Sequence, residues 1–295
     1  MIAPLTEQAD QAGAPFAAPW PLLSRPVPAW RVLTATAAKN LRVARRYLPN
    51  LLGRYAQLGL RVAFFLLMAT VVTVRPGAAA PLAGRELFAF FLAGMLLVVF
   101  IRPSLYAPLE MASADLQSGT LEYLFATPGS RYGYLAGAVL SELALGLVGF
   151  LPLFGVLLWT ARPTALAAAL MLAACALMLV ALTALGVLMA LLAILWRQVG
   201  SIAEVLGVVF EMLAGAYLPV SAFPAAVRGL ACALPYTWGY DLVRHYALGE
   251  RWATLLPPWQ EWAMIAAHAV LYTALSLHLL RRAERRAKQT GLHVL

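Results

Sequence analysis

The sequence predicts an all-α polytopic membrane protein with six transmembrane helices. Of its 295 residues, 62% are hydrophobic and 12% are charged, about half the charged fraction of a typical soluble domain. Several apolar runs reach the roughly 20 residues that one bilayer crossing requires. Because these runs are apolar all around the helix, a soluble helical bundle explains them poorly.

Residues 1–29 are expected to form a mobile leader. They are rich in Pro and Ala, and they lack the basic stretch followed by an apolar core that marks a signal peptide. The two cysteines, Cys175 and Cys232, lie in an apolar run and in a loop, which does not suggest a disulfide framework.

Residues 30–55 are predicted to form an amphipathic helix in the headgroup layer, kinked at Pro49. Apolar residues recur there every three or four positions, from Leu33 to Leu52, and cations occupy the other face. A solvated helix packed on a partner remains a second interpretation.

The six spans are predicted from the lengths of the apolar runs, and each is close to what a bilayer requires. They cover about residues 57–76, 88–112, 134–159, 165–195, 199–219 and 260–280. The purely apolar part of the second span stops at Arg102 and Pro103. If the span continues to residue 112, Arg102 and Glu110 lie inside the membrane.

The distribution of Lys and Arg predicts the orientation. With both termini in the cytoplasm, the cytoplasmic segments carry 15 of these residues and the external segments carry 6, with Arg102 unassigned. We therefore expect a multi-pass protein of the plasma (inner) membrane with a basic cytoplasmic tail at 286–295. Since the cations flank the spans, the net charge of +9 suits a lipid bilayer rather than nucleic acid.

The external segment at about 217–259 is rich in Pro, Gly and aromatic residues and is too apolar for a free loop. We expect short helices that form a re-entrant or interfacial hairpin in the outer leaflet. Non-helical backbone at that depth is tolerated only where protein or a wet cavity covers it.

Motifs for catalysis are missing from the sequence. The two lysines, Lys39 and Lys288, do not follow the glycine pattern of an ATP-binding P-loop. The histidines do not form a zinc-protease pattern, and no Gly-x-Ser-x-Gly elbow occurs. The sequence therefore predicts neither an enzyme nor a metal site.

The stretch "SGTLEYLFATPGSR", residues 118–131, interrupts this apolar chain. Gly119 can end one helix and Thr120 can cap a new one, which Pro128 and Gly129 would end. Its apolar ridge consists of Leu121, Leu124 and Phe125. A short exposed ridge of this kind either docks on a partner or lies on lipid as a connector, and the residues favour neither.

Two stretches resemble the ABC-2-type transporter permeases. The first matches their pattern between the second and third spans, and the second matches their pattern after the fifth span. The matching residues of the first stretch are Gly119, Thr120, Leu121, Glu122, Leu124, Thr127, Pro128, Ser130 and Arg131. Those of the second stretch are Pro219, Pro224, Leu234, Pro235, Asp241, Arg244 and Gly249. The resemblance covers about residues 30–285.

The resemblance implies a permease subunit of an ATP-driven exporter that pairs with a second permease copy and with two separate ATPase subunits. ATP and Mg would then bind to the partner ATPases, and this chain would bind no cofactor. The helix at 119–131 would be the coupling helix, with Phe125 on its ridge, and the hairpin would cap the exit. Arg102 departs from what the family leads us to expect.

Charges inside a membrane usually face a bundle interior or a cavity. Candidates are Arg102 and Glu110 in the second span, Glu142 in the third, and Glu204 and Glu211 in the fifth. We hypothesise that Arg102 lies near Glu211, and that this pair or Glu211 alone lines the transport route. A structural ion pair that holds helices together explains these charges at least as well.

The predicted function is export of a hydrophobic or lipid-linked substrate by alternating access. Two other classes stay open: an ion-gradient-driven secondary transporter or channel that uses its buried glutamates, and a membrane-embedded enzyme. The first would need no ATPase, and the second would need a catalytic cluster that the sequence does not display.

Overall fold

The computed structural model describes residues 27–74, 81–119, 130–196 and 200–290. This part of the chain is helical apart from turns and one isolated bridge between Val74 and Leu82, which agrees with the predicted all-α class. Its α-helices are α1 (Ala29–Arg46), α2 (Leu48–Val71), α3 (Gly84–Gln117), α5 (Arg131–Ala161), α6 (Ala165–Trp196), α7 (Gly200–Leu213), α8 (Ala225–Cys232), α9 (Pro235–Leu248) and α10 (Pro258–Thr290). Two 3₁₀ turns, η2 (Val220–Ala222) and η3 (Gly249–Arg251), complete the described elements.

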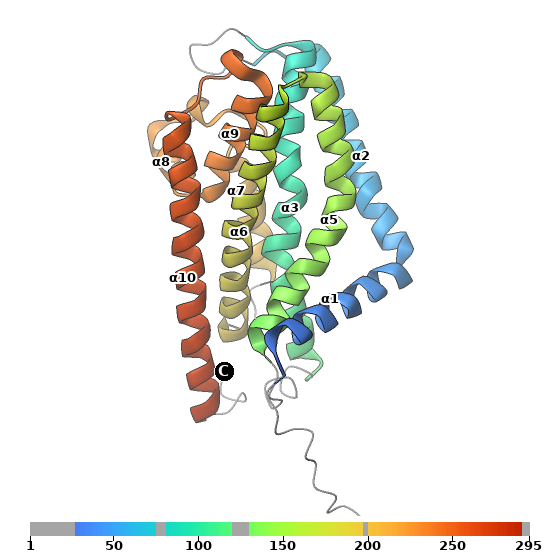
Figure 1. Cartoon of the computed structure of the whole chain (residues 1–295), viewed down its shortest axis with the longest axis vertical. Helices are drawn as coiled ribbons and strands as arrows, with labels where there is room; N and C mark the ends of the chain where they lie inside the picture. Colours follow the sequence, from blue (N-terminus) through green and yellow to red (C-terminus); the bar gives the residue numbers. More distant parts are fainter. Residues whose placement is uncertain (1–26, 75–80, 120–129, 197–199, 291–295) are drawn as a thin grey trace, which may run out of the picture.

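Helix α3 is the centre of the bundle and contacts α2, α5, α6, α7 and α9 (Figure 1). Its first half, from Leu87 to Ile101, is almost completely buried. This explains why that stretch is apolar on every side, because a helix surrounded by other helices has no face left for polar residues.

Helix α1 lies across one end of the bundle, as Figure 1 shows in dark blue. The predicted surface helix at 30–55 was too long, because α1 ends at Arg46 and Tyr47 adopts a non-helical conformation. Residues from Leu48 onward belong to α2, with Pro49 in its first turn. Proline suits a first helical turn, since its missing N–H has no partner there, so Pro49 marks a new helix rather than a kink.

Helix α1 packs closely on the first half of α5, and two small residues of α5 permit this contact. A Cβ atom on Gly133 would lie 2.4 Å from the carbonyl oxygen of Ala29. A Cβ atom on Gly137 would lie 2.6 Å from the carbonyl oxygen of Leu33. The two glycines are four apart and share one helix face, the small-residue pattern that lets helices approach closely in membranes.

The described part of the chain contains five helices long and apolar enough to cross a membrane. They are Leu48–Val71, Gly84–Ile101, Tyr132–Ala161, Ala165–Met189 and Pro258–Arg282. The predicted fifth span at 199–219 is not helical to its predicted end, because α7 ends at Leu213. Gly215, with φ of +89°, lies in the turn that follows it.

The predicted hairpin segment forms η2, α8, α9 and η3. Helix α9 does not lie on the surface, because it packs against α3, α6 and α10 and most of its residues are buried. Protein therefore covers α9, which is the condition for a short helix in an apolar environment, whereas most of α8 is exposed.

Helix α1, the end of α3, the start of α5 and the end of α10 lie at one end of the molecule (Figure 1). The two ends of the described chain thus lie on the same side of the bundle, and the assignment of that side to the cytoplasm stays a prediction. Most of the predicted coupling helix lies outside the described residues, namely Thr120, Leu121, Glu122, Leu124, Phe125, Thr127 and Pro128. At its borders, Gly119 has φ of +71° and the Ser130 side chain accepts a hydrogen bond from the Gly133 amide at 3.2 Å.

Candidate functional site

Helix α2 contacts the bundle through a stripe of residues spaced three or four apart. This stripe consists of Arg54, Leu58, Arg61 and Phe65. Its two arginines lie on a mostly apolar helix. Ala69 is the single residue of α2 with a buried side chain. Polar contacts of the stripe therefore act beside apolar ones, in which Leu58 and Phe65 pack against the core.

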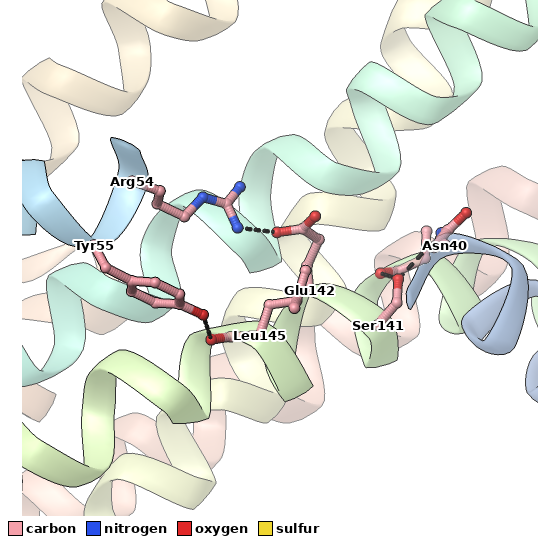
Figure 2. Close-up of polar contacts among 7 residues, drawn as sticks. Asn40, Arg54, Tyr55, Ser141, Glu142 and Leu145 are labelled. Carbon is pink, nitrogen blue, oxygen red and sulfur yellow. Dashed lines mark hydrogen bonds and ion pairs between the residues drawn. The ribbon is translucent and has the colours of Figure 1, made fainter. Parts of the chain in front are cut away.

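The first polar contact joins α2 to α5. Arg54 Nη1 donates to Glu142 Oε2 at 2.7 Å, and the neighbouring Tyr55 hydroxyl donates to the Leu145 carbonyl oxygen at 2.7 Å. Figure 2 shows both side chains of α2 directed at α5. The Arg54 and Glu142 side chains are 45% and 26% exposed, so solvent or headgroups still reach this ion pair.

The second polar contact joins α2 to the end of α7. Arg61 Nη1 lies 3.3 Å from Glu211 Oε1 and 3.3 Å from the Tyr217 hydroxyl oxygen. The Tyr217 hydroxyl donates to the same Glu211 oxygen. The ring of Phe65 stacks on Tyr217 with the centroids 5.2 Å apart, which fixes the Tyr217 side chain beside the ion pair.

These contacts border a cavity of about 330 Å³ between α2, α3, α5 and α7, which we call the α2 cleft. Among the described side chains, its charged lining consists of Arg54, Arg61 and Glu211. The remaining wall is mostly aliphatic, with Tyr55 and Tyr106 among the lining residues. The cleft thus offers an apolar compartment with a few charged groups, the composition typical of a ligand pocket.

A second cavity, of about 360 Å³, lies between α1, α2, α3 and α5, and we call it the α1 cavity. Arg54 and Leu145 line both cavities, and the carboxylates of the α1 cavity are Glu110 and Glu142. At its α1 wall, Asn40 Nδ2 donates to Ser141 Oγ at 3.1 Å (Figure 2).

The structure pairs two of the predicted intramembrane carboxylates with cations of α2. Glu211 pairs with Arg61 and Glu142 pairs with Arg54, both from α2. Arg102 lies in α3, but its side chain is outside what the structure describes, so its predicted approach to Glu211 stays a prediction. The side chain of Glu204 and that of Arg131 are likewise outside the described atoms.

Sequence reasoning missed the cations that complete these pairs. Arg54 and Arg61 were counted among the 15 cytoplasmic cations, although Arg61 lies inside the predicted span 57–76. Arg61 is a charge inside an apolar helix, and it lies seven residues from Arg54 on the same face. This spacing is the signal that could have identified both arginines. Their partners lie 88 and 150 residues away in the sequence, so periodicity carries no information about them.

The hairpin residues serve as structural anchors. Pro219 and Pro224 directly precede η2 and α8, and Pro235 lies in the first turn of α9. The other two hairpin residues that the sequence singled out, Asp241 and Arg244, are buried.

The guanidinium of Arg244 is fully buried and donates to the carbonyl oxygens of Gly215 and Ala216, each at 2.7 Å. It also lies over the Phe90 ring, 3.8 Å from the centroid. Burial lowers the pKa of Arg244 to about 10, so the side chain keeps its charge at neutral pH. Arg244 therefore ties α9 to the turn that follows α7 and to α3.

Asp241 accepts hydrogen bonds from Trp252 Nε1 at 2.5 Å and from the Leu255 amide at 2.7 Å. These bonds hold the segment between α9 and α10 against α9. Within the described residues, no group of three or more His, Cys, Asp or Glu side chains has the arrangement of a metal site.

Comparison with known proteins identifies the family. A family model described as ABC-2 type transporter matches residues 40–248, which include both polar contacts of α2 and the whole of α9. Comparison with curated protein sequences gives no match.

Proposed function

Since the chain belongs to the ABC-2 type transporter family, we propose that it is the permease subunit of an ATP-binding cassette exporter. In this proposal it moves a hydrophobic or lipid-linked substrate out of the cytoplasm, and separate ATPase subunits drive alternating access. The family match over residues 40–248 is the observation that carries the proposal. The chain itself is a membrane transport component, and its family implies partnership with ABC ATPase subunits.

The sequence supports assigning transport to this chain and ATP hydrolysis to its partners. No P-loop is present, so ATP hydrolysis is assigned to the partner chains. Two ATPase copies would bind at the cytoplasmic face, and a second copy of this permease would complete the pathway. The chain would reside in the plasma (inner) membrane with both termini in the cytoplasm.

The proposed coupling element is the segment from Gly119 to Arg131. It follows α3 and precedes α5 in the sequence, and the end of α3 and the start of α5 lie beside α1 at the proposed cytoplasmic end of the bundle (Figure 1). A motion imposed on this segment by an ATPase would act on α3 and α5 together. Both helices line the α2 cleft, so the two helices that would receive motion from the ATPase also form part of the candidate pathway.

The hairpin of α8 and α9 lies toward the opposite end in Figure 1 and is proposed to cap the exit. Substrate would bias the transporter only through different affinities for its inward-open and outward-open states.

The test is a mild-detergent pull-down of the tagged chain from its native cells, with wild type beside Glu122→Arg. The matched control is Glu250→Arg, which makes the same charge change at an exposed residue after α9. We expect an ATPase subunit to co-purify with wild type and with Glu250→Arg and to be lost with Glu122→Arg.

If no nucleotide-binding protein accompanies wild type, the exporter proposal is wrong. Transport driven by an ion gradient through Glu142 and Glu211 would then be the function to assay. If the two variants retain the ATPase equally, the assignment of the coupling contact to Glu122 is wrong.

A further inference from the structure

The α2 cleft presents two guanidinium groups from one helix. Arg54 and Arg61 are seven residues apart, which is two turns and about 10 Å along the axis of α2. Their side chains are 45% and 43% exposed, so neither is sealed in the protein interior. Both can therefore reach a ligand that enters the cleft.

Each guanidinium uses one nitrogen for its carboxylate partner. Arg54 donates through Nη1 to Glu142, and Arg61 donates through Nη1 to Glu211 and Tyr217. A guanidinium carries five N–H groups on three nitrogens. Within the described part of the chain, the Nε and Nη2 atoms of both arginines make no hydrogen bond to protein, which leaves them able to bind an oxyanion.

The charges of the two cavities differ in sign. Among the described side chains, the α2 cleft is lined by two arginines and one carboxylate, that of Glu211. The α1 cavity is lined by Arg54 with two carboxylates, Glu110 and Glu142. A negatively charged group is therefore favoured in the α2 cleft over the neighbouring cavity.

The rest of the α2 cleft suits an apolar chain. Its wall includes Leu58, Val98, Ile101 and Val208. On the outer face of α2, Leu60, Phe64 and Leu67 are 72%, 54% and 60% exposed, so the surroundings of the helix are apolar as well. A ligand with one charged end and one apolar end would match both parts of the lining.

We propose that the α2 cleft binds an anionic amphiphile, with its phosphate or carboxylate head group on Arg54 and Arg61 and its chain along the aliphatic wall. This inference rests on the proposed export function, whose substrate class it names. It also assigns Arg54 and Arg61 two roles, since each would hold the head group while remaining paired with its glutamate.

The test measures equilibrium binding to the purified full chain in nanodiscs of phosphatidylcholine, with binding to empty nanodiscs subtracted. The probes are dodecyl phosphate, dodecyltrimethylammonium and dodecyl maltoside, which share a chain length and differ in head-group charge, and inorganic phosphate, which lacks the chain. We expect saturable binding of dodecyl phosphate alone.

The double variant Arg54→Gln/Arg61→Gln is expected to weaken dodecyl phosphate binding about 10-fold or more, as the loss of charge-assisted hydrogen bonds implies. The matched control is Arg42→Gln/Arg45→Gln, which removes two exposed cations of α1 that line neither cavity. This control should bind within about twofold of wild type, because electrostatic attraction to a basic helix is not the proposed mechanism.

Glu211→Gln provides a variant that keeps both arginines. It releases Arg61 from its carboxylate, so we expect dodecyl phosphate to bind as tightly as to wild type or more tightly. Weaker binding to Glu211→Gln would overturn the proposal, even if the double arginine variant failed to fold.

Three other results would also overturn it. The double arginine variant could bind dodecyl phosphate as tightly as wild type does, or Arg42→Gln/Arg45→Gln could lose as much affinity as the double arginine variant. Dodecyltrimethylammonium could also bind wild type as tightly as dodecyl phosphate does. Inorganic phosphate that binds as tightly as dodecyl phosphate would show a simple anion site and remove the amphiphile from the proposal. Since the assay contains no ATPase, its result is independent of the pull-down that tests the exporter.

Discussion

Replacement of Gly137 by alanine should loosen α1 from α5. A methyl group there would lie 2.6 Å from the Leu33 carbonyl oxygen and 2.7 Å from the Thr36 Cβ. These neighbours belong to or adjoin the backbone of α1, so a rotamer change cannot relieve the contact and α1 must shift. Overpacking of this kind costs about 1–3 kcal/mol.

A matched control lies on the same helix. A Cβ atom on Gly155 would meet nothing within 4 Å, so Gly155→Ala gains helix propensity without a clash. Both substitutions gain the same helix propensity, so the difference between their thermal midpoints reports the steric clash at residue 137. At about 2 °C per kcal/mol for a chain of this size, the midpoint of Gly137→Ala should lie about 2–6 °C below that of Gly155→Ala.

Thermal unfolding of the purified chain in one detergent measures this difference. Trypsin cleavage at Lys39 and Arg42 supplies a local readout, because both residues lie in α1. Faster cleavage is expected for Gly137→Ala alone. If Gly137→Ala unfolds at or above the midpoint of Gly155→Ala, the close packing of α1 on α5 is wrong.

Two further substitutions test other contacts. Arg244→Lys should lower the thermal midpoint by about 2–6 °C, because lysine lacks the planar fork whose two nitrogens reach the two carbonyl oxygens, and leaving a buried acceptor unpaired costs about 1–3 kcal/mol. Arg228→Lys, at an exposed arginine that also donates to two carbonyl oxygens, should change the midpoint by less than about 1 °C. Equal effects of the two substitutions would refute the role of burial. Gly207→Ala should impair folding, since its Cβ would lie 1.4 Å from the Tyr106 hydroxyl oxygen, and Tyr106→Leu should restore a monodisperse gel-filtration peak if that clash is the cause.

The sequence predicted helix content well because apolar runs report burial in lipid or protein directly. It predicted helix ends less well. The amphipathic pattern continues through Tyr47, so the break before Pro49 was interpreted as a kink. The apolar run likewise continues past the end of α7, although Gly215 lies in a turn with positive φ.

The candidate site was predicted in part. Glu142 and Glu211 stood out because carboxylates are rare in apolar runs. Their partners come from a helix far away in the sequence, and the choice between Arg61 and Arg102 as a neighbour for Glu211 depends on tertiary packing. Arg61 was also counted with the cytoplasmic cations, which concealed its place in the bundle.

The break at Tyr47 joins two helices that are attached in different ways. The contact of α1 with α5 places backbone against backbone at two glycines, so a displacement of even a few tenths of an ångström meets steep repulsion. The contacts of α2 run through long, half-exposed side chains that can follow a larger displacement by rotating. We therefore expect α1 and α5 to move as one stiff body and α2 to be the compliant wall of the cleft, with Tyr47 as the joint between them.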